Sequence, residues 1–335
     1  MRLYTSNSLQ QLKTHAGAQV RPDIPQKLYL DITEDCNMYC VMCREKREIK
    51  GQVMDMVLYK RIVDETCKGV TSYSLYNWGE SLLVKDFRER LIYLANRKRS
   101  SAVIDLSTNG TLLTKDMGRF LLDHDVEVIV SFDGADKATF EKIRRGGNFF
   151  RICANLEQIS SLASNMNPYR APGIYISIQK DNWKQLVDIV KLAHELGAKK
   201  IGMGPVTSPI QFRIEPCKEL LDNVAEAINH AESMGIVVDI FPTKLGDHVW
   251  DGERYVNAGR FYVDTNCDAP LTCATIAWNG DVFLCCNVGD FADNITNKSF
   301  SEVWMSDRYN ELRENVNNEE KMPPRCRDCS WVNRY

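Results

Sequence analysis

The twelve cysteines of this 335-residue chain are the residues whose type and spacing most clearly predict chemistry. Cys36, Cys40 and Cys43 have three and then two residues between them and follow directly on a short apolar run. Three thiolates this close suit an iron–sulfur cubane, because soft sulfur ligands bind such clusters and a fourth iron would stay open to a substrate or cofactor. A zinc ion with a distant fourth ligand is the alternative that spacing alone leaves open.

A second set of cysteines lies near the C-terminus, at Cys267, Cys285, Cys326 and Cys329. The turn Asn279-Gly280 between two apolar runs, 275–278 and 282–285, predicts a β-hairpin with a type I′ turn that brings Cys267 and Cys285 together. Four thiol ligands describe either a closed zinc site or a saturated iron–sulfur cluster. Cys286 is adjacent to Cys285 and could replace it as a ligand.

The elements that must position these cysteines alternate along most of the chain. Strand-like apolar runs are 28–32, 71–76, 103–107, 126–132, 174–178 and 200–203, with a weaker seventh at 236–240. Helices are predicted at 85–97, 114–122, 150–162, 183–196 and 219–234. Repeated strand–helix units predict an α/β fold with a parallel sheet. Six such units favour a partial (β/α)6 TIM-like barrel over a doubly wound sheet, and either topology gathers functional residues at the C-terminal ends of the strands.

With three cysteines at this spacing after the first strand, the chain resembles the radical SAM superfamily. Four later segments carry the same resemblance: 77–80, which is similar to the family's Gly-Gly-Glu motif with Trp78 for the first glycine, 107–110, 131–134 and 143–147. The resemblance implies that Cys36, Cys40 and Cys43 hold a [4Fe–4S] cluster whose fourth iron binds S-adenosylmethionine (SAM). It also implies that an electron from the cluster cleaves SAM to a 5′-deoxyadenosyl radical, which abstracts hydrogen from a substrate C–H bond.

The four segments supply the residues that the resemblance implies for SAM binding: Gly79, Glu80, Thr108, Asn109, Ser131, Asp133 and Arg144. The sequence does not distinguish Arg144 from its neighbour Arg145. The C-terminal cysteines resemble the SPASM extension and its shorter twitch form, which carry auxiliary [4Fe–4S] clusters. The later C-x5-C-x3-C run of a full SPASM domain is missing, so one auxiliary cluster is expected, held by Cys267, Cys285, Cys326 and Cys329.

The predicted division of the chain is an N-terminal extension over 1–26, a radical SAM partial barrel over 27–240, and an auxiliary-cluster domain over 241–335 with a hairpin and a helix at 300–316. The favoured function is an oxidoreductase that dehydrogenates a small natural-product or carbohydrate substrate, a two-electron oxidation assisted by the auxiliary cluster. Alternatives are a peptide maturase that forms a thioether or C–C crosslink and an epimerase with Cys217 as hydrogen donor. A non-enzymatic iron–sulfur or zinc scaffold or sensor is a fourth hypothesis.

Charge and hydropathy limit the classes of partner that this chain is expected to bind. The 42 Lys and Arg against 45 Asp and Glu give a net charge of −3, which offers no overall electrostatic basis for binding nucleic acid or an anionic membrane. No run approaches the ~18 apolar residues of a membrane span, and the N-terminus lacks the apolar region of a secretory signal. The expected address is therefore cytoplasmic, where cysteines bind metal rather than form disulfides. The expected partners are a small-molecule or peptide substrate and a reductant such as flavodoxin or ferredoxin.

Overall fold

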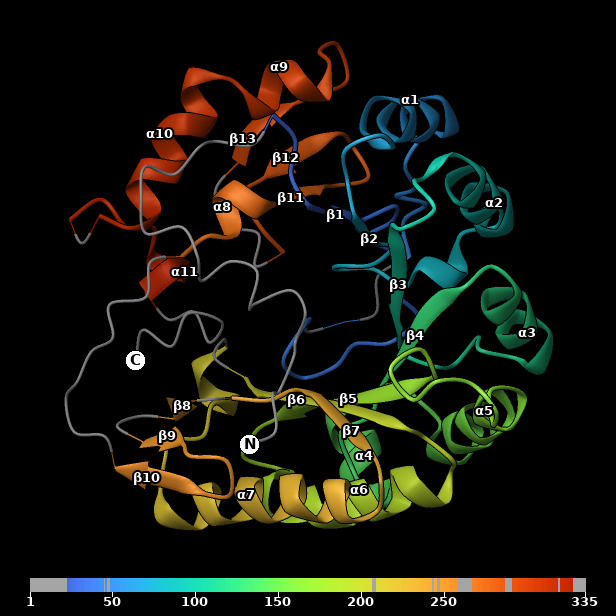
Figure 1. The fold of residues 1–335 in the computed structure, drawn as a ribbon, viewed down its shortest axis with the longest axis vertical. Coiled ribbons are helices and arrows are strands. Elements are labelled where there is room, and N and C mark those ends of the chain that lie inside the picture. The colour runs from blue at the N-terminus through green and yellow to red at the C-terminus, as the bar shows by residue number, and fades with distance from the viewer. Residues whose placement is uncertain are drawn as a thin grey trace.

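The computed structural model describes residues 23–44, 46, 49–206, 209–242, 244–245, 248–257, 267–286, 291–318 and 320–327. A ten-stranded sheet runs in the order β13-β12-β11-β1-β2-β3-β4-β5-β6-β7 and curves into a partial barrel (Figure 1). Neighbours from β1 to β7 pair in parallel, as the strand–helix pattern predicts. These strands are β1 (Lys27–Leu30), β2 (Ser72–Ser74), β3 (Val103–Thr108), β4 (Val126–Ser131), β5 (Gly173–Ile178), β6 (Lys200–Pro205) and β7 (Val237–Ile240).

Helices cover the convex face of this sheet (Figure 1). They are α1 (Met56–Thr66), α2 (Phe87–Arg97), α3 (Lys115–Asp123), α4 (Lys137–Ile143), α5 (Phe149–Leu162), α6 (Leu186–Glu195) and α7 (Lys218–Ser233). Two of them, α1 and α4, were not among the helices predicted from the sequence. Each is capped by an aspartate: Asp55 accepts from the backbone N–H groups of Val57 and Leu58, and Asp136 from that of Thr139.

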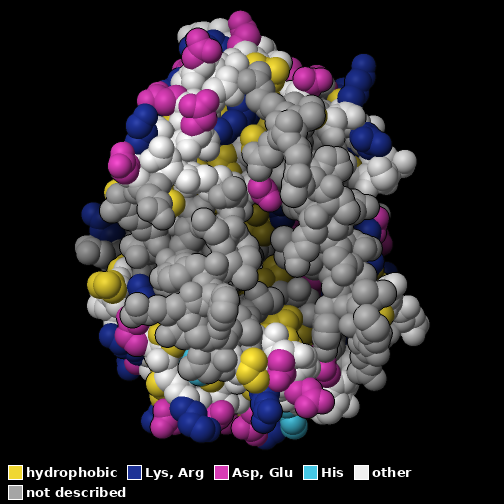
Figure 2. All heavy atoms as spheres, turned by 60° about the vertical axis from the view of Figure 1, so that its left-hand side comes forward, with side chains coloured by type: hydrophobic (Ala, Val, Ile, Leu, Met, Phe, Trp, Pro, Cys, Tyr) yellow, Lys and Arg dark blue, Asp and Glu magenta, His cyan; other side chains and the backbone are white. Residues whose placement is uncertain are grey.

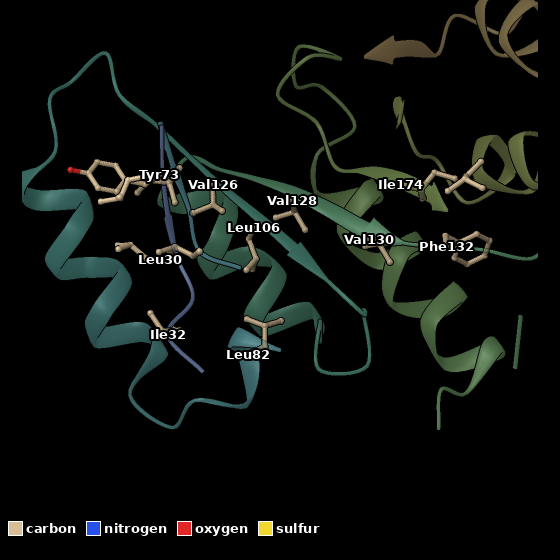
Figure 3. Close-up of a cluster of buried hydrophobic side chains, with 14 of the residues drawn as sticks. Leu30, Ile32, Tyr73, Leu82, Leu106, Val126, Val128, Val130, Phe132 and Ile174 are labelled. Carbon is tan, nitrogen blue, oxygen red and sulfur yellow. The ribbon is translucent and has the colours of Figure 1, made fainter. Parts of the chain in front are cut away.

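The core lies between the strands and the helices, and the strands alternate to build it (Figure 3). In β4, Val126, Val128 and Val130 are buried, while the intervening residues, among them Glu127 and Ser131, face the concave side of the sheet. Each fully buried aliphatic side chain contributes about 1.5–3 kcal/mol of hydrophobic stabilisation. The convex face of the strands is thus used for stability, and the concave side is left for polar and aromatic groups.

The C-terminal region extends the same sheet. Strand β11 (Cys273–Ile276) pairs in parallel with β1, and β12 (Asp281–Phe283) and β13 (Phe291–Asn294) follow as antiparallel strands. The predicted hairpin is present, but its type I′ turn is wrong. Only Gly280 of the turn has a positive φ, at 88°, and its N–H donates to the carbonyl of Ala277. This is a type I turn closed by one left-handed glycine, whereas type I′ needs two left-handed residues.

The helix predicted over 300–316 is two helices, α9 (Phe300–Trp304) and α10 (Asp307–Val316). Met305 is the C-cap of the first, and Ser306 caps the second, because its hydroxyl accepts from the backbone N–H of Tyr309. Arg313 lies over the rings of Trp304 and Tyr309, at 4.2 and 4.1 Å from their centroids, and locks the helix pair. The remaining short elements are α8 (Ala269–Thr272), α11 (Pro324–Arg327), β8 (Lys244–Leu245), β9 (His248–Trp250) and β10 (Tyr255–Asn257).

Charged side chains of both signs are interspersed around the edge of the face shown in Figure 2. Among the described residues, no helix is long and apolar enough to cross a membrane.

Candidate active site

The first three cysteines lie in the loop that follows β1, and the segment after α4 holds this loop in place. The N–H of Tyr39 donates to the carbonyl of Arg145 at 2.9 Å, and that of Val41 donates to the carbonyl of Ile143 at 2.9 Å. Cys40 lies between these two hydrogen bonds. The loop is therefore fixed by a short backbone ladder on both sides of its central cysteine.

The three thiols are close enough for their charges to interact, and N–H donors are aimed at two of them. Burial and, to a smaller extent, the charge of Cys43 raise the pKa of Cys36 and raise that of Cys40 to about 11. Asn109 Nδ2 lies 3.8 Å from Cys36 Sγ, and Arg144 Nη1 lies 3.8 Å from Cys40 Sγ. These donors stabilise sulfur in its thiolate form, which is the form that binds metal.

The three thiols suit a cluster in which each sulfur binds a different iron. Among the described residues, no three His, Cys, Asp or Glu side chains are grouped closely enough to hold one metal ion. A cubane does not need such a group, because each thiolate binds its own iron. Three interacting thiols with N–H donors beside them therefore fit a [4Fe–4S] cluster with one open iron.

Gly79 and Glu80 follow β2 and contact both the segment after β1 and the C-terminal end of β3. A Cβ on Gly79 would lie 1.9 Å from the carbonyl oxygen of Thr33, so only glycine fits there. The buried carboxylate of Glu80 accepts from Thr108 Oγ1 at 2.8 Å and from the N–H of Asn109 at 2.7 Å. Burial raises the pKa of Glu80 and these hydrogen bonds lower it. Four predicted site residues are thus in one network beside the cysteines.

Asp133 and Arg144 form a second, buried part of the site. Arg144 Nε lies 2.7 Å from Asp133 Oδ2, and Asp133 Oδ1 accepts from the N–H of Ser177 at 2.7 Å. Both oxygens of Asp133 are engaged and none of its surface is exposed, so it acts on the site by holding Arg144. Arg144 is the inward member of the arginine pair, while Arg145 is exposed. Ser131 ends β4 opposite Tyr175 of β5.

Of the second set of cysteines, Cys267, Cys285 and Cys326 are described, and Cys329 lies outside the described residues. Burial raises the pKa of Tyr309 on α10, and Cys273 and Cys285 raise it further. Cys286 instead raises the pKa values of the three tyrosines of the concave side, Tyr29, Tyr76 and Tyr175, in each of which burial is the largest cause. Cys285 therefore lies on the side of α10, and Cys286 lies on the side of the barrel tyrosines.

No role was predicted for Cys273 from the sequence, but the hairpin register makes it a candidate ligand of the auxiliary cluster. Thr275 pairs with Phe283 and Ile276 with Val282. β12 ends at Phe283, and the same register extended by two residues would bring Cys285 to Cys273; both cysteines raise the pKa of Tyr309. The two-residue type I′ turn predicted from the sequence would instead place Cys273 opposite Cys286, so the observed register was needed to relate Cys273 to Cys285. Cys273 is therefore a further candidate ligand.

Family comparisons agree with this geometry. The model of the radical SAM superfamily matches residues 30–210, and that of the SPASM iron–sulfur cluster-binding domain matches residues 267–330. This chain belongs to the radical SAM superfamily. The enzyme therefore has a [4Fe–4S] cluster and SAM as cofactors, and its SPASM domain implies auxiliary iron–sulfur clusters.

Two curated relatives match most of the chain. The tungsten-containing aldehyde ferredoxin oxidoreductase cofactor-modifying protein of Pyrococcus furiosus is 24% identical over 90% of this chain and 86% of its own length. The mycofactocin maturase MftC of Mycolicibacterium smegmatis is 27% identical over 87% of this chain and 73% of its own.

Solved structures share the fold. Streptococcus suis SuiB bound to S-adenosylmethionine superposes with a TM-score of 0.67 at 17% identity, covering 92% of this chain and 72% of SuiB. Native anSMEcpe with bound AdoMet also gives 0.67 at 17% identity, covering 91% and 90%. The partial barrel followed by a SPASM domain is thus confirmed, whereas the residue boundaries of the domains remain predictions.

One buried acid of the radical SAM barrel escaped the sequence reading. Asp31 follows β1 directly, which was the available signal, and its Oδ1 accepts from the N–H of Trp78 at 3.3 Å. Burial raises the pKa of Asp31 to about 7, against the lowering effect of hydrogen bonds from Trp78 and Gly79. Asp31 therefore holds the segment before Glu80 through hydrogen bonds from Trp78 and Gly79, and its pKa is about 7.

Asp31 should make the stability of the protein fall as the pH rises from about 4 to about 7. In this window the unfolded chain has lost the proton and the folded protein keeps it, which costs up to about 1.4 kcal/mol per pH unit. Asp31→Asn keeps the acceptor for Trp78 and should flatten this slope, leaving the variant more stable than wild type at pH 7.5. Anaerobic urea unfolding at several pH values measures it, and parallel slopes for the two proteins would contradict the assignment.

Cys285 and Cys286 should differ sharply in their effect on iron content. Cys285→Ala should remove iron from the SPASM domain, because its thiol faces α10, whereas Cys286→Ala should leave the iron unchanged. Iron and labile sulfide per chain after anaerobic reconstitution measure the difference. Iron loss in Cys286→Ala alone would reverse the assignment.

Cys217, the predicted hydrogen donor, is the N-cap residue of α7 and packs partly buried against the core. Its role as a donor stays a prediction.

Proposed function

We propose that this radical SAM enzyme oxidises a carbon centre of a peptide or protein substrate. When bound, SAM and its cluster supply a 5′-deoxyadenosyl radical that abstracts hydrogen, and the auxiliary cluster supplies an acceptor for the electron of the oxidised substrate. Cys36, Cys40 and Cys43 would hold the first cluster. Cys285, with Cys267, Cys326 and Cys329 as predicted and Cys273 as a further candidate, would hold the auxiliary one.

The residues of the chain divide the work of binding. Glu80 is held by Thr108 and Asn109 in a fixed position for the amino group of SAM. Arg144 keeps its charge because Asp133 lies beside it, and it offers that charge to the cluster and to the carboxylate of SAM. Buried, prearranged charges of this kind need no reorganisation when the cofactor binds.

The observation that supports an oxidative outcome is a contact between the two parts of the enzyme. With its amide oriented so that both ends are satisfied, Asn77 donates to the carbonyl of Cys286 at 3.0 Å and accepts from Trp78 Nε1 at 3.2 Å. Asn77 begins the Gly79–Glu80 segment, and Cys286 follows the auxiliary candidate Cys285. One hydrogen bond therefore links the segment proposed to bind SAM to the SPASM hairpin.

The peptide substrate is supported by the relatives. MftC, which aligns over most of both chains, is named a maturase, and the fold neighbours SuiB and anSMEcpe have been solved with peptides. Dehydrogenation of a small natural product or carbohydrate, favoured by the cysteine spacing, remains the second candidate, because the same contact between the two parts serves either substrate.

A deuterium transfer experiment separates the two substrates. A lysate of cells that encode this enzyme, grown in deuterated medium, is divided into peptides and metabolites below peptide size. Each fraction is incubated with enzyme, SAM and dithionite. Deuterium in 5′-deoxyadenosine from the peptide fraction is the expected result, and deuterium only from the metabolite fraction would make the small-molecule oxidation correct. Exchange-labile positions wash out in light water, so the label reports carbon-bound hydrogen.

A further inference from the structure

The pair Arg144-Arg145 has one member that the SAM site does not use. Residues 143–145 run beside 39–41, and successive side chains of such a ladder alternate. Arg144 points inward to Cys40 Sγ, while Arg145 is exposed to solvent. Because the carbonyl of Arg145 accepts from the N–H of Tyr39, one hydrogen bond and a few covalent bonds separate this surface from the cysteine.

Next to Arg145, the first turn of α5 carries an exposed aromatic residue and a second cation. Phe150 is 65% exposed, the highest value of any aromatic side chain among the described residues. Arg151 is also exposed, and neither Arg145 nor Arg151 forms an ion pair with a described residue. A cation in the first turn of a helix opposes the helix dipole, and an exposed phenylalanine gives up hydrophobic stabilisation. Phe150 keeps an edge contact with the ring of Phe149, at 5.5 Å between centroids, and leaves most of its surface open to a partner.

The other charges close to this face offset the two arginines only in part, because the carboxylate of Glu141 carries one negative charge. Lys142 and Asp181 pair with each other at 2.7 Å, and Glu141 accepts from the N–H of Phe149 at 3.2 Å. The face therefore presents a positive, partly apolar surface next to the cluster loop of a protein whose overall charge is −3. A negatively charged partner is the complement of such a patch.

We propose that the face formed by Arg145, Phe150 and Arg151 is the docking site of an acidic flavodoxin-type carrier that reduces the cluster held by Cys36, Cys40 and Cys43. One electron leaves the reduced flavin of the carrier and the oxidised cluster takes it up, and no atom is transferred. Electron-transfer encounters are small and transient, so one aromatic anchor flanked by cations is enough to orient them. The proposal rests on the proposed function, because only a radical SAM enzyme needs this electron.

The test compares Arg145→Glu/Arg151→Glu with a charge reversal at the other end of the barrel. Arg99 is exposed, forms no ion pair with a described residue and lies in the connection before β3, at the N-terminal ends of the strands. Arg99→Glu therefore makes half the charge change away from the cluster loop, and Arg99→Glu/Lys68→Glu matches it in full, since Lys68 follows α1 at the same end. The probe is an acidic flavodoxin, used oxidised for binding and reduced for electron transfer.

At low ionic strength, the double variant of the face should bind oxidised flavodoxin about ten-fold more weakly and accept electrons from reduced flavodoxin about ten-fold more slowly. Cluster reduction is followed by its absorbance in stopped flow. Added salt should slow the wild type toward the variant, and the Arg99 and Lys68 controls should behave as wild type. Phe150→Ser should weaken binding without changing its salt dependence.

An assay with dithionite as the reductant distinguishes failure of the docking-site proposal from failure of the proposed function. Dithionite needs no docking site, so the variant of the face should form 5′-deoxyadenosine with dithionite as fast as wild type, which also shows that it is folded and loaded. Equal flavodoxin binding and equal reduction rates in wild type and variant would overturn the docking site alone. No 5′-deoxyadenosine from wild type with dithionite would overturn the proposed function itself.

Discussion

Replacing Cys36, Cys40 and Cys43 together by alanine should lower the iron content from about eight to about four atoms per chain and abolish 5′-deoxyadenosine formation. The three thiols are the proposed ligands of the SAM-binding cluster, and the loop that carries them is held from both sides of Cys40. Without the cluster there is no electron for SAM. Iron and sulfide analysis of anaerobically reconstituted protein, paired with a dithionite assay for the nucleoside, measures both effects.

Cys67→Ala/Cys153→Ala is the matched control for this experiment. Cys67 ends α1 and Cys153 lies within α5, and both pack partly buried against the core. Their removal should leave about eight irons and full nucleoside formation. Wild type with about four irons and bound zinc would instead support a zinc site in the SPASM region, and undiminished iron in the triple variant would refute the assignment of the first cluster.

Breaking the Asp133–Arg144 pair should be the most destabilising single change in the site. Asp133→Asn keeps the acceptor for Ser177 but leaves the buried guanidinium without its counter-charge, and losing one partner of a buried pair costs about 3–5 kcal/mol. The free energy of unfolding, measured by urea under anaerobic conditions, should fall by that amount. The Kd for SAM should rise in parallel, because Arg144 is no longer held in position.

A double replacement separates stability from function at this pair. Asp133→Asn/Arg144→Met removes the unpaired charge and should recover much of the lost stability, because an apolar side chain of similar volume fills the space. It should not recover SAM binding. If Asp133→Asn unfolds like wild type, the pair is not a stabilising one, and if the double variant binds SAM normally, Arg144 is not a SAM-binding residue.

The limit of sequence-based prediction is clearest where two residues of the same type are adjacent in the chain. Arg144 and Arg145 are indistinguishable as letters, and so are Cys285 and Cys286. The direction of a side chain depends on which strand or loop runs beside it. That partner is distant in the chain, since 39–41 orients the arginines and β11 orients the cysteines.

The local turn shows the same limit. Asn279-Gly280 is a strong hairpin signal, and a hairpin is what the chain forms. The type of turn was decided by the register of β12 against β11, which needs three loop residues and only one left-handed glycine. The two aspartate-capped helices, α1 and α4, were not predicted from the sequence. Both follow polar loops, and their hydrophobic repeats are short.

The sequence by itself determined the family and the parallel barrel and gave the cysteines proposed to bind metal, because soft-ligand spacing and strand–helix alternation are local properties of the chain. Tertiary structure alone decided that Glu80 accepts a hydrogen bond from the end of β3 and that Asp133 pairs with Arg144. It also decided that the SPASM hairpin joins the barrel sheet beside β1. These arrangements depend on burial and on contacts between residues far apart in sequence. Such contacts arise only once the sheet has closed around them.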